Sequence, residues 1–267
     1  MAAIGIFDSG VGGLSVFQAI RHQLPSESLV YLGDSARVPY GTKSAQSVRR
    51  YALQATKKLV ERDIKALVVA CNTASAVALP ALQEAYPNIP VIGVIEPGAQ
   101  AAVGASKNQH IAVIGTEGTI NGKAYEHAIQ ALNQSAQVDA LATQMLVSMA
   151  EEGWTQNKLA QLAVDEYLRG LFFVENAPDT LMLGCTHFPV FRPVIEAFVG
   201  PTVTVVDSAS TTAIAIEALL AKHQLFERHG PAREHFMVTD GPERFARVAR
   251  VFLDEPIAPT QVELVDL

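Results

Sequence analysis

Short apolar runs rich in Val, Ile and Leu alternate along the chain with longer segments whose apolar residues recur every three or four positions. The short runs predict buried β-strands, and the longer segments predict helices. The predicted strands span residues 3–7, 28–32, 66–69, 91–94, 111–114, 138–142, 180–183, 203–206 and 235–238. The predicted helices span residues 14–24, 43–62, 73–85, 123–134, 157–171, 211–223 and 242–252.

Many of the predicted strands are apolar at nearly every position rather than at every second one. Such strands are expected in parallel sheets that helices cover on both faces, so the pattern predicts a doubly wound α/β fold with mainly parallel sheets. In these folds ligands bind beyond the carboxyl ends of the strands. The segments that follow the strands are small and polar: Asp8-Ser9-Gly10-Val11-Gly12-Gly13, Gly33-Asp34-Ser35, Cys71-Asn72-Thr73, Gly115-Thr116-Glu117-Gly118-Thr119, Cys185-Thr186-His187 and Asp207-Ser208.

The chain contains two similar segments, residues 67–73 and 181–187, each an apolar strand followed by a small residue and a cysteine. A strand with a Gly- and hydroxyl-rich ending lies upstream of each segment. Since 267 residues are enough for two domains, we predict two similar α/β domains with the active site in the cleft between them. The first comprises residues 1–95 and 210–267, and the second comprises residues 96–209. Glu96-Pro97-Gly98 and Asp207-Ser208 are candidate hinges.

Composition and charge exclude several classes of function. The net charge of −7 and the scattered Lys and Arg residues argue against nucleic-acid binding. No apolar run approaches the roughly 20 residues that span a bilayer, and the N-terminal stretch lacks the basic region of a secretory signal. We therefore expect a soluble cytoplasmic protein that binds neither membranes nor nucleic acid.

The two cysteines, Cys71 and Cys185, are the residues with the clearest chemical meaning. A disulfide is not expected in the reducing cytoplasm, and the absence of C-x-x-C spacing argues against a metal site. Each cysteine precedes a predicted helix, where free backbone N–H groups stabilise a thiolate and lower the pKa of the thiol. Each can then act as a base when ionised and as an acid when protonated.

Two such thiols facing each other across a cleft suit the inversion of a stereocentre by proton transfer. A base removes the α-proton from one face while an acid returns a proton to the other, and the roles exchange for the opposite enantiomer. Hydrogen-bond donors for the developing carbanion follow the same strands: Ser9, Asn72, Thr73 and Thr186. We expect Asp8 to tune Cys71 and His187 to tune Cys185.

Four stretches resemble signature segments of the glutamate racemases, a group within the aspartate/glutamate racemase superfamily. They are residues 5–14, 34–41, 70–75 and 183–189, and the match runs in order from about residue 4 to residue 250. The resemblance implies an enzyme without cofactor or metal that supplies D-glutamate for bacterial peptidoglycan, and it suggests a homodimer. It also implies that Cys71 takes the proton from D-glutamate and Cys185 takes it from L-glutamate.

The same resemblance implies further roles for individual residues. Asp8, Glu151 and His187 match assisting acid–base positions. The residues that match substrate contacts are Asp8, Ser9, Tyr40, Gly41, Asn72, Thr73, Thr116, Thr119, Thr186 and His187. Residues 146–153 depart from the family's usual Pro and aliphatic residues before the glutamate, which leaves Glu152 as a competitor of Glu151.

Three other interpretations are compatible with the pattern. The glycine-rich turn and Asp34 resemble half of a dinucleotide-binding unit, but Ser15 stands where the third glycine of G-x-G-x-x-G belongs. A non-catalytic binding protein with paired lobes is the second, and a relative acting on aspartate or hydantoins is the third.

Asp34 is equally compatible with a turn anchor, and Asp207 is expected to begin the last long helix. The other histidines are expected on the surface: His22, His110, His127, His223, His229 and His235.

Overall fold

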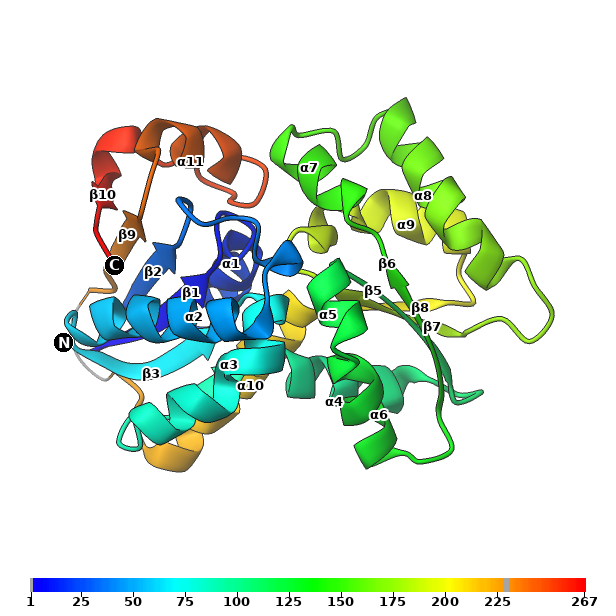
Figure 1. Ribbon diagram of the computed structural model, residues 1–267, viewed down its shortest axis with the longest axis horizontal. Coiled ribbons are helices and arrows are strands. Elements are labelled where there is room, and N and C mark those ends of the chain that lie inside the picture. The colour runs from blue at the N-terminus through cyan, green and yellow to red at the C-terminus, as the bar shows by residue number, and fades with distance from the viewer. Residues whose placement is uncertain (1, 228–230) are drawn as a thin grey trace.

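The computed structural model describes residues 2–227 and 231–267, which form two lobes that lie side by side (Figure 1). The first lobe is built on a six-stranded sheet with the order β10-β9-β2-β1-β3-β4. The second is built on a four-stranded sheet with the order β6-β5-β7-β8. Every strand pair within the described residues is parallel. The predicted fold class is therefore confirmed.

The strands expected from the sequence are all present, with ends shifted by one or two residues. The first sheet contains β1 (Ala3–Asp8), β2 (Leu29–Gly33), β3 (Ile64–Val69), β4 (Val91–Gly93), β9 (Glu234–Val238) and β10 (Val262–Leu264). The second contains β5 (His110–Gly115), β6 (Gln137–Ala142), β7 (Thr180–Gly184) and β8 (Thr204–Asp207). The sequence does not predict β10, because three residues are too few to show a strand period.

The helices that belong to the first lobe are α1 (Leu14–Gln23), α2 (Ala45–Val60), α3 (Asn72–Ala85), α10 (Ser208–His223) and α11 (Pro242–Ala249). Those of the second lobe are α4 (Ile95–Ala105), α5 (Glu117–Asn121), α6 (Ala124–Leu132), α7 (Met145–Glu151), α8 (Lys158–Phe172) and α9 (Arg192–Val199). Short 3₁₀ segments are η1 (Tyr40–Thr42), η2 (Phe188–Phe191) and η3 (Pro259–Gln261).

The candidate hinge Glu96-Pro97-Gly98 is not a loop, since it lies in the first turn of α4. Proline is tolerated there because the first N–H groups of a helix have no partner within the helix. Asp207, by contrast, begins α10 as expected, and its carboxylate accepts a hydrogen bond of 2.8 Å from the Ser210 N–H. The division of the chain at residues 95 and 210 stays a prediction, although β9 and β10 do join the first sheet.

The two sheets share one strand order, because β2-β1-β3-β4 in the first corresponds to β6-β5-β7-β8 in the second. Cys71 follows β3 and Cys185 follows β7, so the cysteines occupy equivalent places. The internal similarity predicted from the two cysteine segments is thus present in the topology. The carboxyl ends of β1, β3, β5 and β7 are where such sheets bind ligands.

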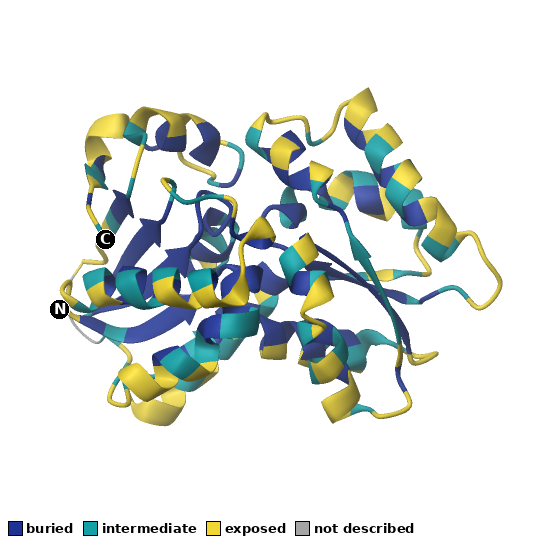
Figure 2. Cartoon of the chain, in the orientation of Figure 1, coloured by how far each residue is buried: buried dark blue, intermediate teal, exposed yellow. Residues whose placement is uncertain are grey.

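Most strands are buried on both faces, as their continuous apolar pattern predicts, whereas the edge strand β6 is only partly buried (Figure 2). On β1, Ile4 and Ile6 belong to one apolar cluster, whereas Ala3 and Phe7 belong to another beneath α2 and α3. The cluster that contains Ile4 also contains residues of β5 and β7, so the apolar core continues from one lobe into the other. Within the described residues no helix is long and apolar enough to cross a membrane.

The surface position expected for His110 is wrong. This residue begins β5, is 7% exposed, and lies 2.8 Å from both the Asp139 carboxylate and the Asn176 carbonyl oxygen. Because both ring nitrogens have a partner, the imidazole can be buried without an unsatisfied group. Of the other histidines, His229 lies outside the described residues, His235 is half-buried on β9, and three are exposed on helices: His22, His127 and His223.

Candidate active site

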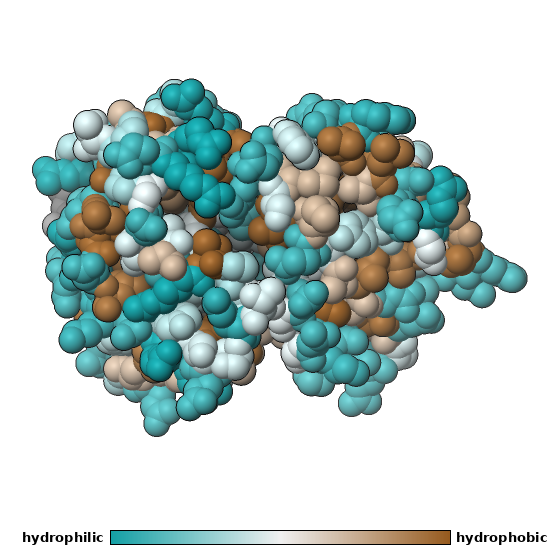
Figure 3. All heavy atoms as spheres, turned by 45° about the horizontal axis from the view of Figure 1, so that its top comes forward, coloured by the Kyte–Doolittle hydropathy of each residue, from teal (hydrophilic) through white to brown (hydrophobic). Residues whose placement is uncertain are grey.

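A cavity of about 30 Å³ lies between the lobes at the carboxyl ends of the central strands. In the space-filling view a notch separates the two halves of the molecule (Figure 3). The first lobe contributes Ser9, Val38, Pro39, Tyr40, Gly41, Cys71, Asn72 and Thr73 to its lining. The second lobe contributes Thr116, Gln144, Val147, Cys185, Thr186 and His187. One free cysteine from each lobe therefore borders the same cavity.

Cys71 is held by the backbone at the start of α3. It is the N-cap residue, and its Sγ accepts a hydrogen bond of 3.4 Å from the Ala74 N–H and lies 3.6 Å from Ser9 Oγ. Burial raises the pKa of the Cys71 thiol to about 12, and the nearby Asp8 carboxyl adds to this against the Ala74 N–H. The lowered pKa expected from the helix N-terminus is therefore wrong for Cys71, because burial outweighs the helix.

Asp8 lies behind the cavity at the end of β1 and is fully buried. Its Oδ2 accepts a hydrogen bond of 2.9 Å from the Gly10 N–H, whereas Oδ1 has no partner among the described residues. Burial raises the pKa of Asp8, although His187 and the Gly10 N–H oppose the rise. A buried carboxylate oxygen without a partner is suited to a cationic group of a ligand.

The described partner of Cys185 is a side chain, whereas Cys71 accepts a hydrogen bond from a backbone N–H. Its Sγ lies 3.8 Å from His187 Nδ1, and His187 Nε2 lies 3.4 Å from Glu151 Oε1. Burial lowers the pKa of His187, but the contacts with Cys185 and Glu151 outweigh it and raise this pKa to about 10. This shift favours the imidazolium form of His187 when Cys185 is ionised. The structure brings Glu151 to His187, whereas Glu152 is exposed at the end of α7.

Three threonines connect the lobes beside the cavity. Thr73 Oγ1 on α3 lies 2.9 Å from Thr116 Oγ1 and 3.3 Å from Thr119 Oγ1, and the latter two are 3.1 Å apart. Thr119 does not line the cavity and lies behind the other two. Its predicted contact with a substrate would thus act through Thr73 and Thr116.

Asn72 is fixed from two sides. The Tyr125 hydroxyl on α6 donates a hydrogen bond of 2.7 Å to Asn72 Oδ1, and Asn72 Nδ2 donates one of 3.3 Å to Ser208 Oγ. Tyr125 belongs to the second lobe and Asn72 to the first, so this bond also crosses between lobes. The amide orientation is therefore set by both lobes together.

Asp34 is an anchor for the loop that carries Tyr40 and Gly41. Its carboxylate accepts hydrogen bonds of 2.6 Å from the Tyr40 hydroxyl and 2.8 Å from the Thr239 hydroxyl, and it is fully buried. Burial and the adjacent Asp34 raise the pKa of Tyr40, so its phenol stays neutral. Of the two functions that the sequence leaves open for Asp34, the structure favours the turn anchor.

The glycine-rich turn after β1 is explained by the approach of the lobes. A Cβ at Gly12 would collide with the His187 ring and the Thr186 hydroxyl, and a Cβ at Gly41 would lie 2.8 Å from Thr116 Cβ. Small residues are therefore required where the first lobe touches the second. This packing role removes the main reason for a dinucleotide-binding interpretation of the turn.

The structure also adds residues that the sequence does not predict. Val147 reaches the cavity from α7, and Gln144 reaches it from the position just before this helix. Their spacing of three residues places both on one helical face. Gln144 Oε1 is buried without a partner among the described residues. Arg244 on α11 donates a hydrogen bond of 2.8 Å to Glu151 Oε2 across the lobes. No local pattern marks Arg244, because the contact exists only in the folded molecule.

A protein-family model described as Asp/Glu/Hydantoin racemase matches residues 4–216. The chain belongs to the Asp/Glu/hydantoin racemase family. A glutamate racemase of Geobacter metallireducens is 50% identical over 252 residues, which cover 94% of this chain and 92% of the relative. Within the family, the chain thus has its place among the glutamate racemases.

Two solved structures agree with this placement. The crystal structure of glutamate racemase isoform RacE1 from Bacillus anthracis has a TM-score of 0.93 and 39% identity, covering 100% of this chain and 98% of that one. The glutamate racemase from Francisella tularensis, crystallised in complex with D-glutamate, has a TM-score of 0.91 and 34% identity. That similarity covers 99% of this chain and 97% of the other.

Proposed function

We propose that this protein interconverts L- and D-glutamate without a cofactor, with Cys71 and Cys185 as the two groups that exchange the α-proton. The observation that carries the proposal is the pair of free cysteines that border one cavity from equivalent places in two similar lobes. Glutamate is favoured over aspartate and hydantoins because the relatives cited above are glutamate racemases.

In the direction from L to D, the Cys185 thiolate removes the α-proton and becomes a thiol. The Cys71 thiol then gives its proton to the opposite face of the carbanion and becomes a thiolate. The C–H bond that breaks on one face is replaced by a C–H bond on the other, so no proton is consumed. The reverse direction starts from the Cys71 thiolate and D-glutamate, as the family resemblance implies.

The surroundings of the two cysteines suit removal of the proton from the L enantiomer. A pKa of about 12 keeps Cys71 protonated at neutral pH, which is the state of an acid. The His187 imidazolium, with a pKa of about 10, attracts the negative charge that Cys185 acquires as a base. Burial strengthens this attraction.

Hydrogen-bond donors and acceptors around the cavity account for substrate binding. The unpaired Oδ1 of Asp8 receives the substrate ammonium group. Hydroxyl and backbone N–H donors hold the oxygens of the substrate α-carboxylate. Such donors contribute most as the carbanion forms, because negative charge then develops on these oxygens. The proposed contacts are Ser9, Tyr40, Gly41, Asn72, Thr73, Thr116, Thr186 and His187, with Thr119 and Glu151 acting through them.

Substrate access requires the lobes to separate. A cavity of about 30 Å³ accommodates about one water molecule, which is far smaller than glutamate. The junction of β8 and α10 at Asp207-Ser208 is the proposed hinge. Crystal structures with and without glutamate test this part: equal lobe angles and an unchanged cavity in both would contradict it.

The test of the proposed function is incubation of the purified protein with L- or D-glutamate in D₂O. We expect the circular dichroism signal to fall to zero whether the reaction starts from L- or from D-glutamate. Deuterium should enter the α-position of the product without added metal, nucleotide or pyridoxal group. Cys71→Ser and Cys185→Ser should each slow inversion by at least about 10³-fold. Racemisation of aspartate or a hydantoin in preference to glutamate would overturn the substrate assignment.

The wider biological context follows from the family resemblance. We propose a cytoplasmic homodimer that supplies D-glutamate for peptidoglycan. Analytical ultracentrifugation tests the dimer, and rescue of a bacterium that requires external D-glutamate tests the supply. A monomer at micromolar concentration, or failure of an active enzyme to rescue growth, would contradict the respective statement.

A further inference from the structure

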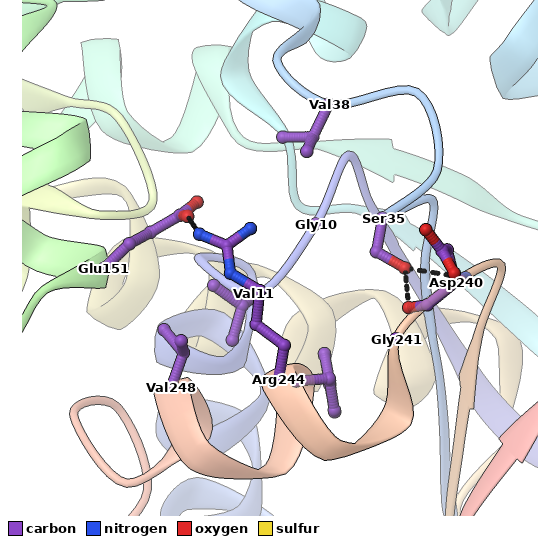
Figure 4. Close-up of a pocket in the computed structure, with 10 residues that line it drawn as sticks. Gly10, Val11, Ser35, Val38, Glu151, Asp240, Gly241, Arg244 and Val248 are labelled. Carbon is purple, nitrogen blue, oxygen red and sulfur yellow. Dashed lines mark hydrogen bonds and ion pairs between the residues drawn. The ribbon is translucent and has the colours of Figure 1, made fainter.

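The ion pair between Arg244 and Glu151 joins the two lobes at the rim of the active site. Arg244 extends from α11 in the first lobe, Glu151 ends α7 in the second, and the two side chains point toward one another (Figure 4). Arg244 Nη2 lies 2.8 Å from Glu151 Oε2. The lobes must be close for this contact to form.

Glu151 connects that ion pair to Cys185. Its second oxygen, Oε1, lies 3.4 Å from His187 Nε2, and His187 Nδ1 lies 3.8 Å from Cys185 Sγ. Exposure decreases along this chain of contacts: the side chain of Arg244 is 56% exposed, that of Glu151 15% and that of His187 6%. An exposed cation thus reaches a largely buried carboxylate, which in turn holds the imidazole beside the sulfur.

The charges along this series of contacts, from Arg244 to Cys185, alternate in sign. His187 is faced by Asp8, Cys185 and Glu151, and Glu151 is faced by His187 and Arg244. Burial raises the pKa of Glu151, but His187 and Arg244 outweigh it and lower this pKa, so the carboxylate stays ionised. Without Arg244, Glu151 would lose one of its two partners, and His187 would be held by a less ordered carboxylate.

We propose that Arg244 is a positioning residue for the Cys185 half of the reaction, acting across the lobe interface through Glu151 and His187. This inference rests on the proposed two-cysteine racemisation. Since its two partners belong to different lobes, the contact also links lobe closure to the arrangement of Cys185. Cys71 has no counterpart of this kind, because its described partners are Ser9 and a backbone N–H.

The test compares Arg244→Gln, which removes the charge, with Arg244→Lys, which keeps it. Arg247→Gln is the matched control, because Arg247 is exposed on the same helix and forms no ion pair within the described residues. The readout is kcat together with the primary deuterium isotope effect on kcat/KM for each α-deuterated enantiomer. The two isotope effects are required because L- and D-glutamate have equal free energies, which forces kcat/KM to be equal in both directions.

We expect Arg244→Gln to lower kcat about tenfold, less than the roughly 10²-fold loss typical of removing an acid–base group itself. The isotope effect should rise for L-glutamate, whose proton Cys185 removes, and fall for D-glutamate, whose proton Cys71 removes. Arg244→Lys should restore most of the rate, and Arg247→Gln should behave as wild type. The variants should fold normally, because a partly exposed ion pair contributes little to the stability of a protein.

Isotope effects that change equally for both enantiomers, or Arg244→Gln rates equal to those of Arg247→Gln, would overturn the inference. So would an Arg244→Lys variant as slow as Arg244→Gln. None of these results would affect the proposed function, which fails instead if the wild-type protein does not racemise glutamate. The two failures are therefore distinguishable in one set of measurements.

Discussion

Cys71 and Cys185 stand at equivalent places in the two lobes, yet different kinds of groups surround them. Cys71 accepts a hydrogen bond from a backbone N–H of α3, and burial together with the Asp8 carboxyl behind it raises the pKa of its thiol. Cys185 lies beside the imidazole of His187, which the Glu151 carboxylate holds. The backbone topology of the two halves is alike, whereas the titratable group next to the sulfur is a carboxyl in one half and an imidazole in the other.

This contrast shows what a duplicated fold does and does not provide. Equivalent strand ends place two sulfur atoms on one cavity, which satisfies the geometry of a two-sided proton exchange. Two identical surroundings would give both thiols the same protonation state, and the reaction needs one acid and one base at the same time. The side chains around each cysteine supply that difference, and each half should therefore respond separately to mutation.

The largest expected effects come from the two neighbours themselves. Asp8→Asn and His187→Asn should each reduce kcat/KM by about 10²- to 10⁴-fold, the range for removing an acid–base group. Asp8→Asn should raise the isotope effect for α-deuterated D-glutamate, and His187→Asn should raise that for the L enantiomer. Steady-state kinetics with unlabelled and α-deuterated L- and D-glutamate measure kcat/KM and both isotope effects.

The exposed residue His22 provides a control for the histidine substitution. His22→Asn should leave both rates and both isotope effects unchanged. If Asp8→Asn and His187→Asn shifted the isotope effects in the same direction, the separation of the two halves would be wrong, even if both variants were slow.

The sequence predicts much of the fold and the centre of the site because both depend on local signals. A buried strand shows itself as an apolar run, and the residue after it lies at the ligand-binding end of a parallel sheet. Cys71, Cys185 and Asp8 are found in this way. Helix α4 is missed because Glu96-Pro97-Gly98 reads as a break, although proline fits the first turn of a helix.

The rest depends on how distant segments pack. Arg244 reaches Glu151 only because α11 and α7 meet across the lobes, and no spacing along the chain indicates this. Burial of His110 depends likewise on Asp139 on a neighbouring strand. The pKa of Cys71 is predicted in the wrong direction, since the sequence shows the helix that would lower it but not the desolvation that raises it.

Gly12 gives a way to disturb the Cys185 half from the first lobe. In Gly12→Ala the new methyl group would collide with the His187 ring and the Thr186 hydroxyl, so the imidazole must move or the lobes must stay apart. We expect kcat/KM to fall roughly 10- to 100-fold, because a misplacement of about 1 Å has effects of this size. The isotope effect should rise for L-glutamate, as for His187→Asn.

The matched control is Gly170→Ala on α8, where an added Cβ meets nothing within 4 Å. This variant should keep full activity and gain about 0.5–1 kcal/mol of stability, because alanine favours a helix over glycine. Wild-type kinetics in Gly12→Ala would show that the approach of the turn to His187 has no part in catalysis.

The smallest expected effect is on folding stability in alkaline solution, and the two halves should act in different pH windows. Folded His187 keeps its proton up to a pKa of about 10, whereas the unfolded chain releases it near 6.5. The folded state therefore binds more protons in this window, and the free energy of unfolding must fall as the pH rises. For Cys71 the folded value is about 12 and the ordinary value is 9.0, so the same loss begins only above pH 9.0.

Urea unfolding at a series of pH values separates the two contributions. Relative to His187→Asn, the wild type should lose about 1 kcal/mol per pH unit between roughly pH 7 and pH 9, since one pKa unit corresponds to about 1.4 kcal/mol. Relative to Cys71→Ser, it should lose nothing in that range and begin to lose stability only at higher pH. If both differences had the same pH dependence, the two cysteines would share one electrostatic environment, because only distinct neighbours can separate the windows.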